Sequence, residues 1–180
     1  MLEWIEMKVR SSVHERAWIL RDLVLGADDG MITTFAIISG SAGASLTTGV
    51  VVILGLANLF ADGLSMAFSV YMGTKSEVEF EKAKGEPHWR SDYPLKQGFI
   101  TFMSFVIAGL IPLTPYLLNM KGRFWISSFI LGISLFFIGV FKSVRTGKNW
   151  VRGGMEMLAT GGAMATVAYL VGFFAERYLV

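Results

Sequence analysis

The sequence predicts an all-α integral membrane protein with five membrane-spanning helices and a cytoplasmic N-terminus, on three observations. First, 53% of the 180 residues are hydrophobic, only 17% are charged, and the mean hydropathy is +0.55. A soluble domain is about a quarter charged, so this composition suits a surface that faces lipid. Second, five apolar segments each approach the roughly 20 residues needed to cross a bilayer. Third, the basic residues gather on alternate connections, which indicates an orientation.

The five predicted spans follow one another with short polar connections. They cover residues 23–44, 50–73, 98–118, 124–141 and 154–175. The fourth is the most uniformly apolar, whereas Asp28 and Asp29 interrupt the first. The one longer connection, residues 74–97, is rich in Lys and Glu and predicts a short solvated helical extension followed by a loop. Pro94 is expected in the first turn of the third span, where a missing N–H costs nothing.

Residues 1–20 precede the first span within a single membrane domain that covers residues 1–180. Their apolar side chains recur at helical spacing, at Leu2, Ile5, Val9, Val13, Ala17 and Leu20. This pattern predicts an amphipathic helix lying along the cytoplasmic interface, with packing against a partner protein as the alternative. The segment lacks the basic start, short apolar run and small-residue cleavage site of a signal peptide, so we expect no cleaved leader.

The orientation follows from the basic side chains. All but three of the 16 Lys and Arg residues lie before the first span, in the connection after the second span, or in the connection after the fourth. The exceptions are Lys121, Arg123 and Arg177. Since basic residues favour the cytoplasmic side, the N-terminus is predicted to be cytoplasmic and the C-terminus to lie opposite. The compact design favours a prokaryotic plasma membrane, with an organelle membrane as the alternative.

Composition also excludes several classes of function. The sequence contains no cysteine, which excludes disulfides, thiolate metal sites and cysteine nucleophiles. Its net charge of +2 and the lack of a basic tract with interleaved aromatic residues argue against nucleic-acid binding.

Two of the predicted spans carry a polar stripe. A charge at the bilayer centre costs several kcal/mol, so an ionisable residue there is a functional candidate. On the first span one face carries Asp22, Gly26, Asp29, Thr33 and Gly40. On the second span one face carries Asn58, Asp62, Ser65, Met66 and Ser69. Such stripes are what a permeation path needs, because their groups replace a cation's water shell while the other faces meet lipid.

The residue types on these stripes indicate the cargo. Asp29 and Asn58 offer hard oxygen ligands, and Met66 offers a polarisable thioether. Mg²⁺ and Ca²⁺ prefer oxygen alone and Cu⁺ prefers several sulfurs, so a mixed set points to Fe²⁺, Mn²⁺ or Co²⁺. Packing is an equally weighted reading for Met66. Metal and proton are expected to compete for the Asp29 carboxylate, which is the minimal chemistry of a metal/proton antiporter. Structural roles for Asp29 and Asp62 are the alternative.

Other acids are weaker candidates. Glu77 and Glu81 are spaced i, i+4 just beyond the second span, with His88 nearby, and would gather cations at the cytoplasmic mouth. A solvated Lys/Glu helix has the same pattern and is the favoured reading. Glu156 lies one turn after Arg152 and is expected to form an ion pair with it at the interface.

A homodimer is expected with the first helix at its centre. Gly26 and Gly30 form a GxxxG step that allows a second helix to approach closely, and a path shared between two copies doubles the available ligands. Two alternative functions stay open from the residues alone. One is an intramembrane aspartyl-type hydrolase that uses Asp29 and Asp62 as a dyad sharing a proton. The other is a scaffold subunit that transports nothing.

The two stripes also carry a family resemblance. The first-span run RDLVLGADDGMITTFAIISGSAGA and the second-span run GLANLFADGLSMAFSVYMGTKSE resemble the paired signatures of the vacuolar iron transporter family, the VIT-like and nodulin-21-like group. The runs FVIAGLIPLTPYLL and RGGMEMLATGGAMATVAYLVG are also similar to that family. The resemblance implies a non-enzymatic transporter with five helices per subunit, a path between two subunits, and export of cytosolic Fe²⁺, often also Mn²⁺, against protons. The metal is its substrate, and no cofactor is implied.

The resemblance assigns roles residue by residue. Asp29 matches the family's membrane-embedded metal-binding aspartate, and Met66 matches the methionine of the second-span motif. Asn58 stands where several plant and parasite members carry glutamate, so this chain has one negative charge fewer. Residues 74–97 are too few for the three-helix cytoplasmic domain of the plant transporters, which predicts a short form in which Glu77 and Glu81 are at most a remnant of that domain.

Overall fold

In the residues that it describes, the computed structural model of the chain contains five helices, one for each predicted span. The structure describes residues 2–85 and 93–179, and the side chains of residues 13–85 and 93–178. The helices are α1 (Leu2–Gly43), α2 (Thr48–Ala83), α3 (Pro94–Leu117), α4 (Arg123–Arg145) and α5 (Trp150–Leu179). Each contains an apolar window long enough to cross a bilayer. The prediction of an all-α, multi-pass membrane protein is therefore confirmed.

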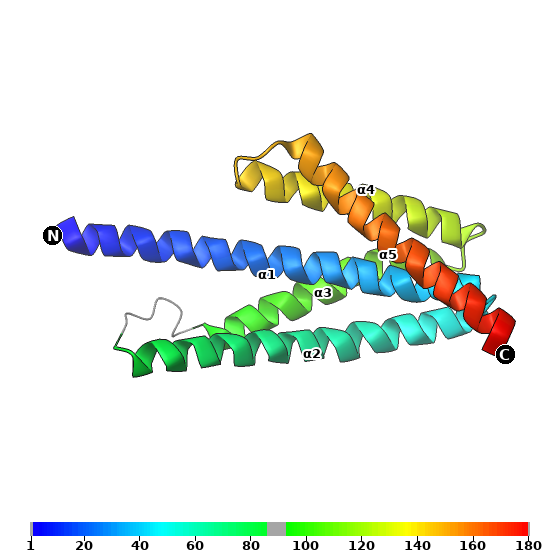
Figure 1. Ribbon diagram of the computed structural model, residues 1–180, viewed down its shortest axis with the longest axis horizontal. Helices are drawn as coiled ribbons and strands as arrows, with labels where there is room; N and C mark the ends of the chain where they lie inside the picture. Colours follow the sequence, from blue (N-terminus) through cyan, green and yellow to red (C-terminus); the bar gives the residue numbers. More distant parts are fainter. Residues whose placement is uncertain (1, 86–92, 180) are drawn as a thin grey trace.

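Two helices are longer than predicted. α1 runs without interruption from Leu2 to Gly43, so residues 1–20 are not a separate helix but continue the axis of the first span (Figure 1). No Gly or Pro precedes Gly26 in this helix, so nothing in the chain breaks it at the predicted boundary. An interfacial location for residues 1–20 stays a prediction. α2 continues to Ala83, about three turns into the connection that was expected to hold one or two.

The connections contain the residues that tight turns require. Gly122 precedes α4 with a φ of 69°, and Gly147 follows α4 with a φ of 68°, which is the left-handed region that favours glycine. Pro94 occupies the first turn of α3, as predicted.

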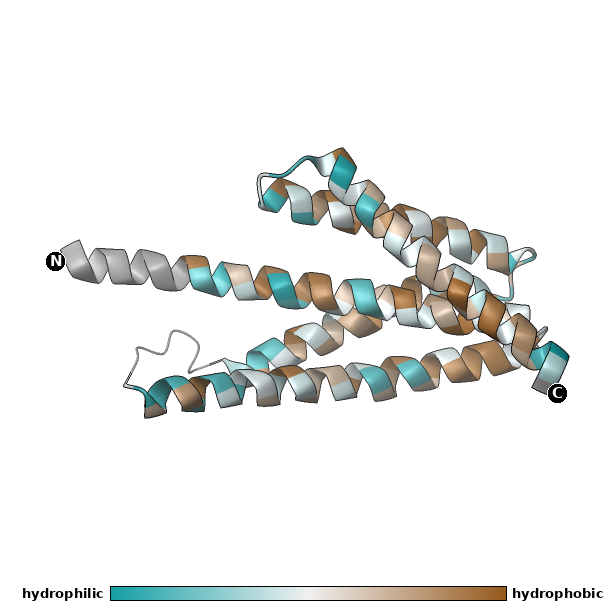
Figure 2. Cartoon of the chain, viewed as in Figure 1, coloured by the Kyte–Doolittle hydropathy of each residue, from teal (hydrophilic) through white to brown (hydrophobic). Residues whose placement is uncertain are grey.

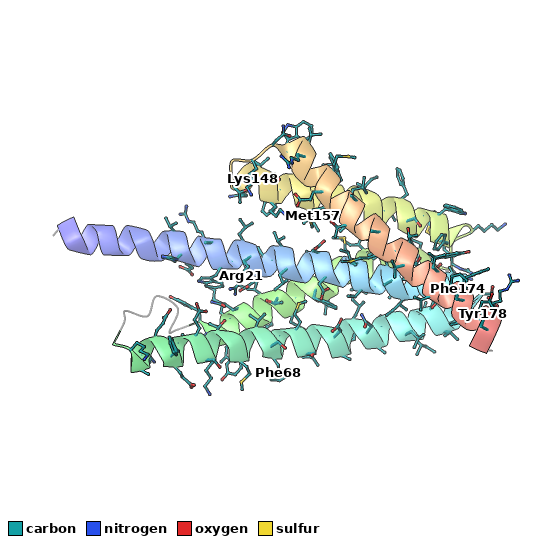
Figure 3. All side chains as sticks on the ribbon, in the orientation of Figure 1. Arg21, Phe68, Lys148, Met157, Phe174 and Tyr178 are labelled. Carbon is teal, nitrogen blue, oxygen red and sulfur yellow. The ribbon has the colours of Figure 1, made fainter. Side chains whose placement is uncertain are left out.

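α1 lies at the centre of the bundle. It packs against α3 on one side and against α4 and α5 on the other, while α2 packs mainly on α3 (Figure 1). The core between these helices is apolar and includes Ile38, Leu59, Phe105, Leu113 and Leu135, each with an exposed fraction of 1% or less. Figure 2 shows apolar residues along the length of the helices and hydrophilic ones concentrated near their ends. Large apolar side chains such as Phe68 and Trp125 point outward (Figure 3 labels Phe68), as expected of a lipid-facing surface.

Glycines allow α1 and α3 to approach closely. A Cβ atom on Gly26 would lie 2.5 Å from the carbonyl oxygen of Thr101, and one on Gly30 would meet the backbone of Phe105. The GxxxG step therefore does admit a second helix, but that helix is α3 of the same chain. The prediction that Gly26 and Gly30 bring together the α1 helices of two subunits is wrong, because α3 already covers this face.

A buried polar network joins α1, α2 and α3 at the end of the bundle where α1 begins. The Gln97 side-chain oxygen accepts hydrogen bonds from Thr74 Oγ1 at 2.7 Å and from Arg21 at 3.2 Å. Arg21 also pairs with Asp22 at 2.7 Å, and the Asp22 side chain is fully buried. Further out, Lys96 pairs with Glu15 at 3.0 Å. These contacts tie the first half of α1 to the start of α3.

Candidate metal-binding site

Asp29 lies on α1 and Asp62 on α2, two helices that are in contact. Asp29 lies near the midpoint of the apolar stretch Val13–Gly43 and Asp62 near that of Thr48–Ala83. Both side chains are half-buried, and the Asp62 carboxylate lies within electrostatic range of Asp29. One turn along α1, the half-buried Thr33 Oγ1 donates a hydrogen bond to the Asp29 carbonyl oxygen at 2.7 Å. The two acids that the sequence singled out thus both lie near the middle of membrane-spanning helices.

Asn58, Asp62 and Met66 occupy three successive turns of α2. They are spaced four residues apart and are all half-buried, so they form one row beside the α3 contact. Leu59 and Gly63, next to this row, are buried. Met66 also packs against the hydrophobic core, so its thioether is held in place by packing. The serines predicted for the same stripe, Ser65 and Ser69, lie on its exposed margin.

The amide of Asn58 is incompletely satisfied within the subunit. Its Nδ2 atom is buried and has no hydrogen-bond partner in the described part of the chain. A buried polar atom without a partner costs roughly 1–3 kcal/mol. The two ends of an amide are assigned from their surroundings, and rotation by 180° would place the carbonyl oxygen in the same position. This orphaned group marks the position as one where a further ligand fits.

The predicted stripe on α1 does not continue toward the N-terminal side. Asp22 is fully buried and paired with Arg21, and Gly26 is packed against α3. Neither residue can line a path, because α3 covers both of them. Asp29 and Thr33 remain half-buried, while Gly40 packs near Ala168 of α5. The prediction of a single polar face from Asp22 to Gly40 is therefore wrong for its first half.

Asp28 has a different environment from Asp29. Its carboxylate interacts electrostatically with Lys142 near the end of α4, and its Oδ1 atom is buried without a hydrogen-bond partner among the described residues. Neighbouring residues of a helix diverge by about 100°, which separates Asp28 from Asp29, but helical periodicity gives no sign that Lys142 lies near Asp28.

Glu77 and Glu81 do not join the Asp29–Asp62 site. Glu77 lies 15 residues beyond Asp62, which is roughly 22 Å along the helix axis. Glu77 is exposed and Glu81 is half-buried. His88, the third predicted member of this group, lies outside the described residues. Within residues 13–85 and 93–178 no three His, Cys, Asp or Glu side chains gather as a metal cluster, so a role for Glu77 and Glu81 stays a prediction.

The predicted ion pair between Arg152 and Glu156 is not formed. Both side chains are exposed and line a cavity between α4 and α5, but neither makes an ion pair within the described residues. The spacing of four residues permits such a pair without requiring it, because two solvated side chains gain little from it.

The chemistry available at the site is that of a cation ligand set. Two carboxylates within electrostatic range of each other favour the binding of a divalent cation or of a proton. Amide and thioether groups on the neighbouring turns of α2 would complete a mixed oxygen–sulfur set, which suits a borderline divalent ion.

Five helices that are each long and apolar enough to cross a bilayer define a multi-pass membrane protein. The chain belongs to the VIT family, whose profile it matches over residues 20–92 and 85–173. It is 25% identical to the vacuolar iron transporter of Plasmodium berghei over 220 aligned positions, which cover 85% of this chain and 81% of the parasite protein. It is 24% identical to vacuolar iron transporter 1 of Arabidopsis thaliana, covering 84% of each chain. An uncharacterised protein of Methanocaldococcus jannaschii is 25% identical, over 84% of this chain and 87% of that protein.

The comparisons also bear on the hydrolase alternative and on the expected shortness of the connection between α2 and α3. The family is one of transporters, so the aspartyl hydrolase reading of Asp29 and Asp62 is set aside. The two matched stretches meet at residues 85–92, in the connection between α2 and α3. The alignment to the Plasmodium berghei protein is longer than this 180-residue chain, so that relative contains residues that this chain lacks.

Proposed function

We propose that this protein transports divalent iron or manganese out of the cytosol, in exchange for protons, along a path between two copies of the chain. The observation that carries the proposal is the position of Asp29 and Asp62, within electrostatic range of each other, near the middle of two membrane-spanning helices. The vacuolar iron transporters among the relatives supply the cargo class.

A second subunit is supported by the partial exposure of the polar side chains at the site. Asp29, Asp62 and Asn58 are only half-buried by their own subunit. On a membrane-spanning surface their remaining exposed area would face acyl chains, which costs several kcal/mol for a charged group. A second copy that presents the same three side chains removes this cost and doubles the number of ligands. In a symmetric pair the two rows face each other across the twofold axis.

The ligands support a transition metal rather than Mg²⁺ or Ca²⁺. Met66 contributes a thioether that hard cations do not use. Fe²⁺ and Mn²⁺ accept oxygen ligands together with one sulfur ligand per subunit. Asn58 lowers the negative charge of the row relative to a carboxylate, which weakens binding and thereby eases release during transport.

Proton exchange follows from the same carboxylates. Metal arriving from the cytosol displaces protons from Asp29 and Asp62, and protons arriving from the other side displace the metal. Lowering the pH on the metal-loading side therefore weakens loading, and lowering it on the opposite side speeds release. Alternating exposure of one site to the two sides is enough to couple the two fluxes. We place the protein in the plasma membrane of a prokaryote, in keeping with its short connection between α2 and α3.

Transport into proteoliposomes tests the proposal. The wild-type protein is expected to carry Fe²⁺ and Mn²⁺, and Asp29→Ala is expected to abolish uptake while the oligomer survives. Glu79→Gln is the matched control, since Glu79 is an exposed acid on α2 outside the site. Transport by Asp29→Ala at the wild-type rate would defeat the proposal.

An imposed pH gradient separates coupled exchange from passive flow. Uptake should rise when the side that receives the metal is acidic, and should collapse when an ionophore dissipates the gradient. A flux that ignores the gradient contradicts antiport and leaves a uniporter. A scaffold subunit, the remaining alternative, predicts no metal binding by calorimetry in either the wild-type protein or the variant.

A further inference from the structure

A cavity lies between the end of α4 and the start of α5, away from the Asp29–Asp62 site. Its volume is about 510 Å³ and it is lined by Lys142, Ser143, Lys148, Asn149, Arg152, Gly153 and Glu156. Figure 3 shows Lys148 at the turn that joins the two helices. The cavity lies at the end of the bundle that the basic residues predict to be cytoplasmic.

The walls of the cavity are held firmly. Gly139 of α4 and Gly153 of α5 are in close contact, since a Cβ atom on Gly139 would meet the Gly153 carbonyl group. Ser143 is buried, and a Cβ atom on Gly153 would collide with its hydroxyl oxygen. The turn is closed by a hydrogen bond from the Lys148 amide to the Ser143 carbonyl oxygen at 2.8 Å. The cations are therefore presented from a closely packed helix pair and its tight turn.

The cations of the cavity are not neutralised by the protein. Lys148 and Arg152 form no ion pair with any side chain of the described residues. Lys142 interacts electrostatically with Asp28, which offsets part of its charge. Glu156 is the one acid of the lining, so the three cations leave the cavity net positive even when Asp28 is included. Positive charge concentrated in a concave site attracts anions.

The start of α5 adds to this field. The Asn149 side chain accepts hydrogen bonds from the Val151 and Arg152 amides at 3.0 and 3.2 Å, which caps the helix and fixes its first turn at the cavity. The helix dipole places partial positive charge there. The Arg152 guanidinium can bond two oxygens of one phosphate, while Lys142 and Lys148 act as point charges.

We infer that this cavity binds a phosphate group. Two sources carry that chemistry, the headgroup of an anionic phospholipid and soluble phosphate. The predicted cytoplasmic location brings the cavity beside the leaflet surface, where anionic headgroups attract basic residues. The inference concerns a site separate from the metal path and holds whether or not the chain transports metal.

Ligand-dependent thermal stability of the full-length protein in a neutral detergent tests the inference. The probes are short-chain phosphatidylglycerol, inorganic phosphate, and phosphatidylcholine as a zwitterionic comparison. The cavity variant is Lys148→Gln/Arg152→Gln. The matched control is Lys82→Gln/Lys84→Gln, which removes two positive charges from exposed positions on the same side of the bundle.

Saturable stabilisation of the wild type is expected, with a fall in apparent affinity of about tenfold or more in the cavity variant and no change in the control. A response to phosphatidylglycerol alone identifies a lipid headgroup, and a response to inorganic phosphate identifies the soluble anion. If the double variant does not fold, Arg152→Lys replaces it. This variant should lose affinity by a smaller factor, because lysine keeps the positive charge but cannot bond two oxygens of one phosphate as the guanidinium does. Equal responses of the wild type and the cavity variants, or no saturable response to either anion, would overturn the inference.

Discussion

The Arg21 guanidinium reaches from α1 to the side-chain oxygen of Gln97 at the start of α3, at 3.2 Å. Thr74 of α2 donates to the same oxygen at 2.7 Å, so one amide joins three helices. Gln97 is 1% exposed. Further along α1, the backbone of α3 covers Gly26 and Gly30, whereas Asp29 stays half-buried. The junction and these glycine contacts together hold α1 against α3.

Removing the junction should destabilise the bundle. Gln97→Ala deprives Thr74 of its acceptor and Arg21 of one partner, which costs about 1–3 kcal/mol. For a chain of this size that is roughly 2–12 °C in the thermal unfolding midpoint in detergent. Leu95→Ala, two residues away on an exposed position, is the control and should shift the midpoint little. An unchanged midpoint in Gln97→Ala would mean that the three helices do not depend on this amide.

The contact between α1 and α3 should be intolerant of a single methyl group at Gly30. In Gly30→Ala the new Cβ atom meets the Phe105 backbone, which cannot yield as a flexible side chain would, so we expect a loss of about 1–3 kcal/mol. Gly73→Ala in α2 meets nothing within 4 Å and should instead gain up to about 1 kcal/mol from helix propensity. Unfolding midpoints of the two variants are compared directly. Similar shifts in both would refute close packing at Gly30.

Restoring a charge at position 58 should tighten metal binding. Asn58→Glu adds a carboxylate one turn from Asp62 and, on the proposed function, lowers the KM for Fe²⁺ or Mn²⁺ severalfold. Release then becomes slower, so the maximal rate is expected to fall. Asn58→Leu is the control for loss of the amide alone and should raise the KM. Uptake at varied metal concentration provides both constants, and a KM that is unaffected by Asn58→Glu would place this residue outside the path.

Cysteine cross-linking tests the proposed arrangement of the two subunits. The chain contains no cysteine, so a single introduced thiol reports one position. Leu25 lies one turn before Asp29 and is 44% exposed, whereas Phe129 on α4 is 69% exposed. Leu25→Cys should form a covalent dimer on mild oxidation in membranes, and Phe129→Cys should not. Cross-linking through Phe129→Cys alone would place the interface on α4.

Hydropathy and helical periodicity were sufficient to predict the five helices and the row of polar and thioether side chains on α2. Each span is a long apolar run, and Asn58, Asp62 and Met66 share a face because they are four residues apart. These signals depend only on the direction in which a side chain leaves its own helix.

The neighbours of each face could not be predicted in this way. Gly26 and Gly30 indicated a close helix contact, but the pattern does not distinguish α3 from a second copy of α1. Likewise, helical spacing placed Asp22 on a polar stripe. In the structure Asp22 is buried and pairs with Arg21, which in turn bonds Gln97 of α3. The partner of each group comes from residues about 75 positions further along the chain, and a spacing rule of three or four residues does not reach them.

The unbroken length of α1 has a mechanical consequence. At about 1.5 Å per residue its 42 residues extend roughly 63 Å, about twice the thickness of the hydrocarbon core. Asp29 divides this rod unequally, with the longer arm toward the N-terminus. A helix without a hinge rotates as one body, so a small tilt near Asp29 becomes a sweep of several ångströms at the far tip. A partner bound to this end of α1 outside the bilayer would therefore oppose the helix movements that the proposed transport requires.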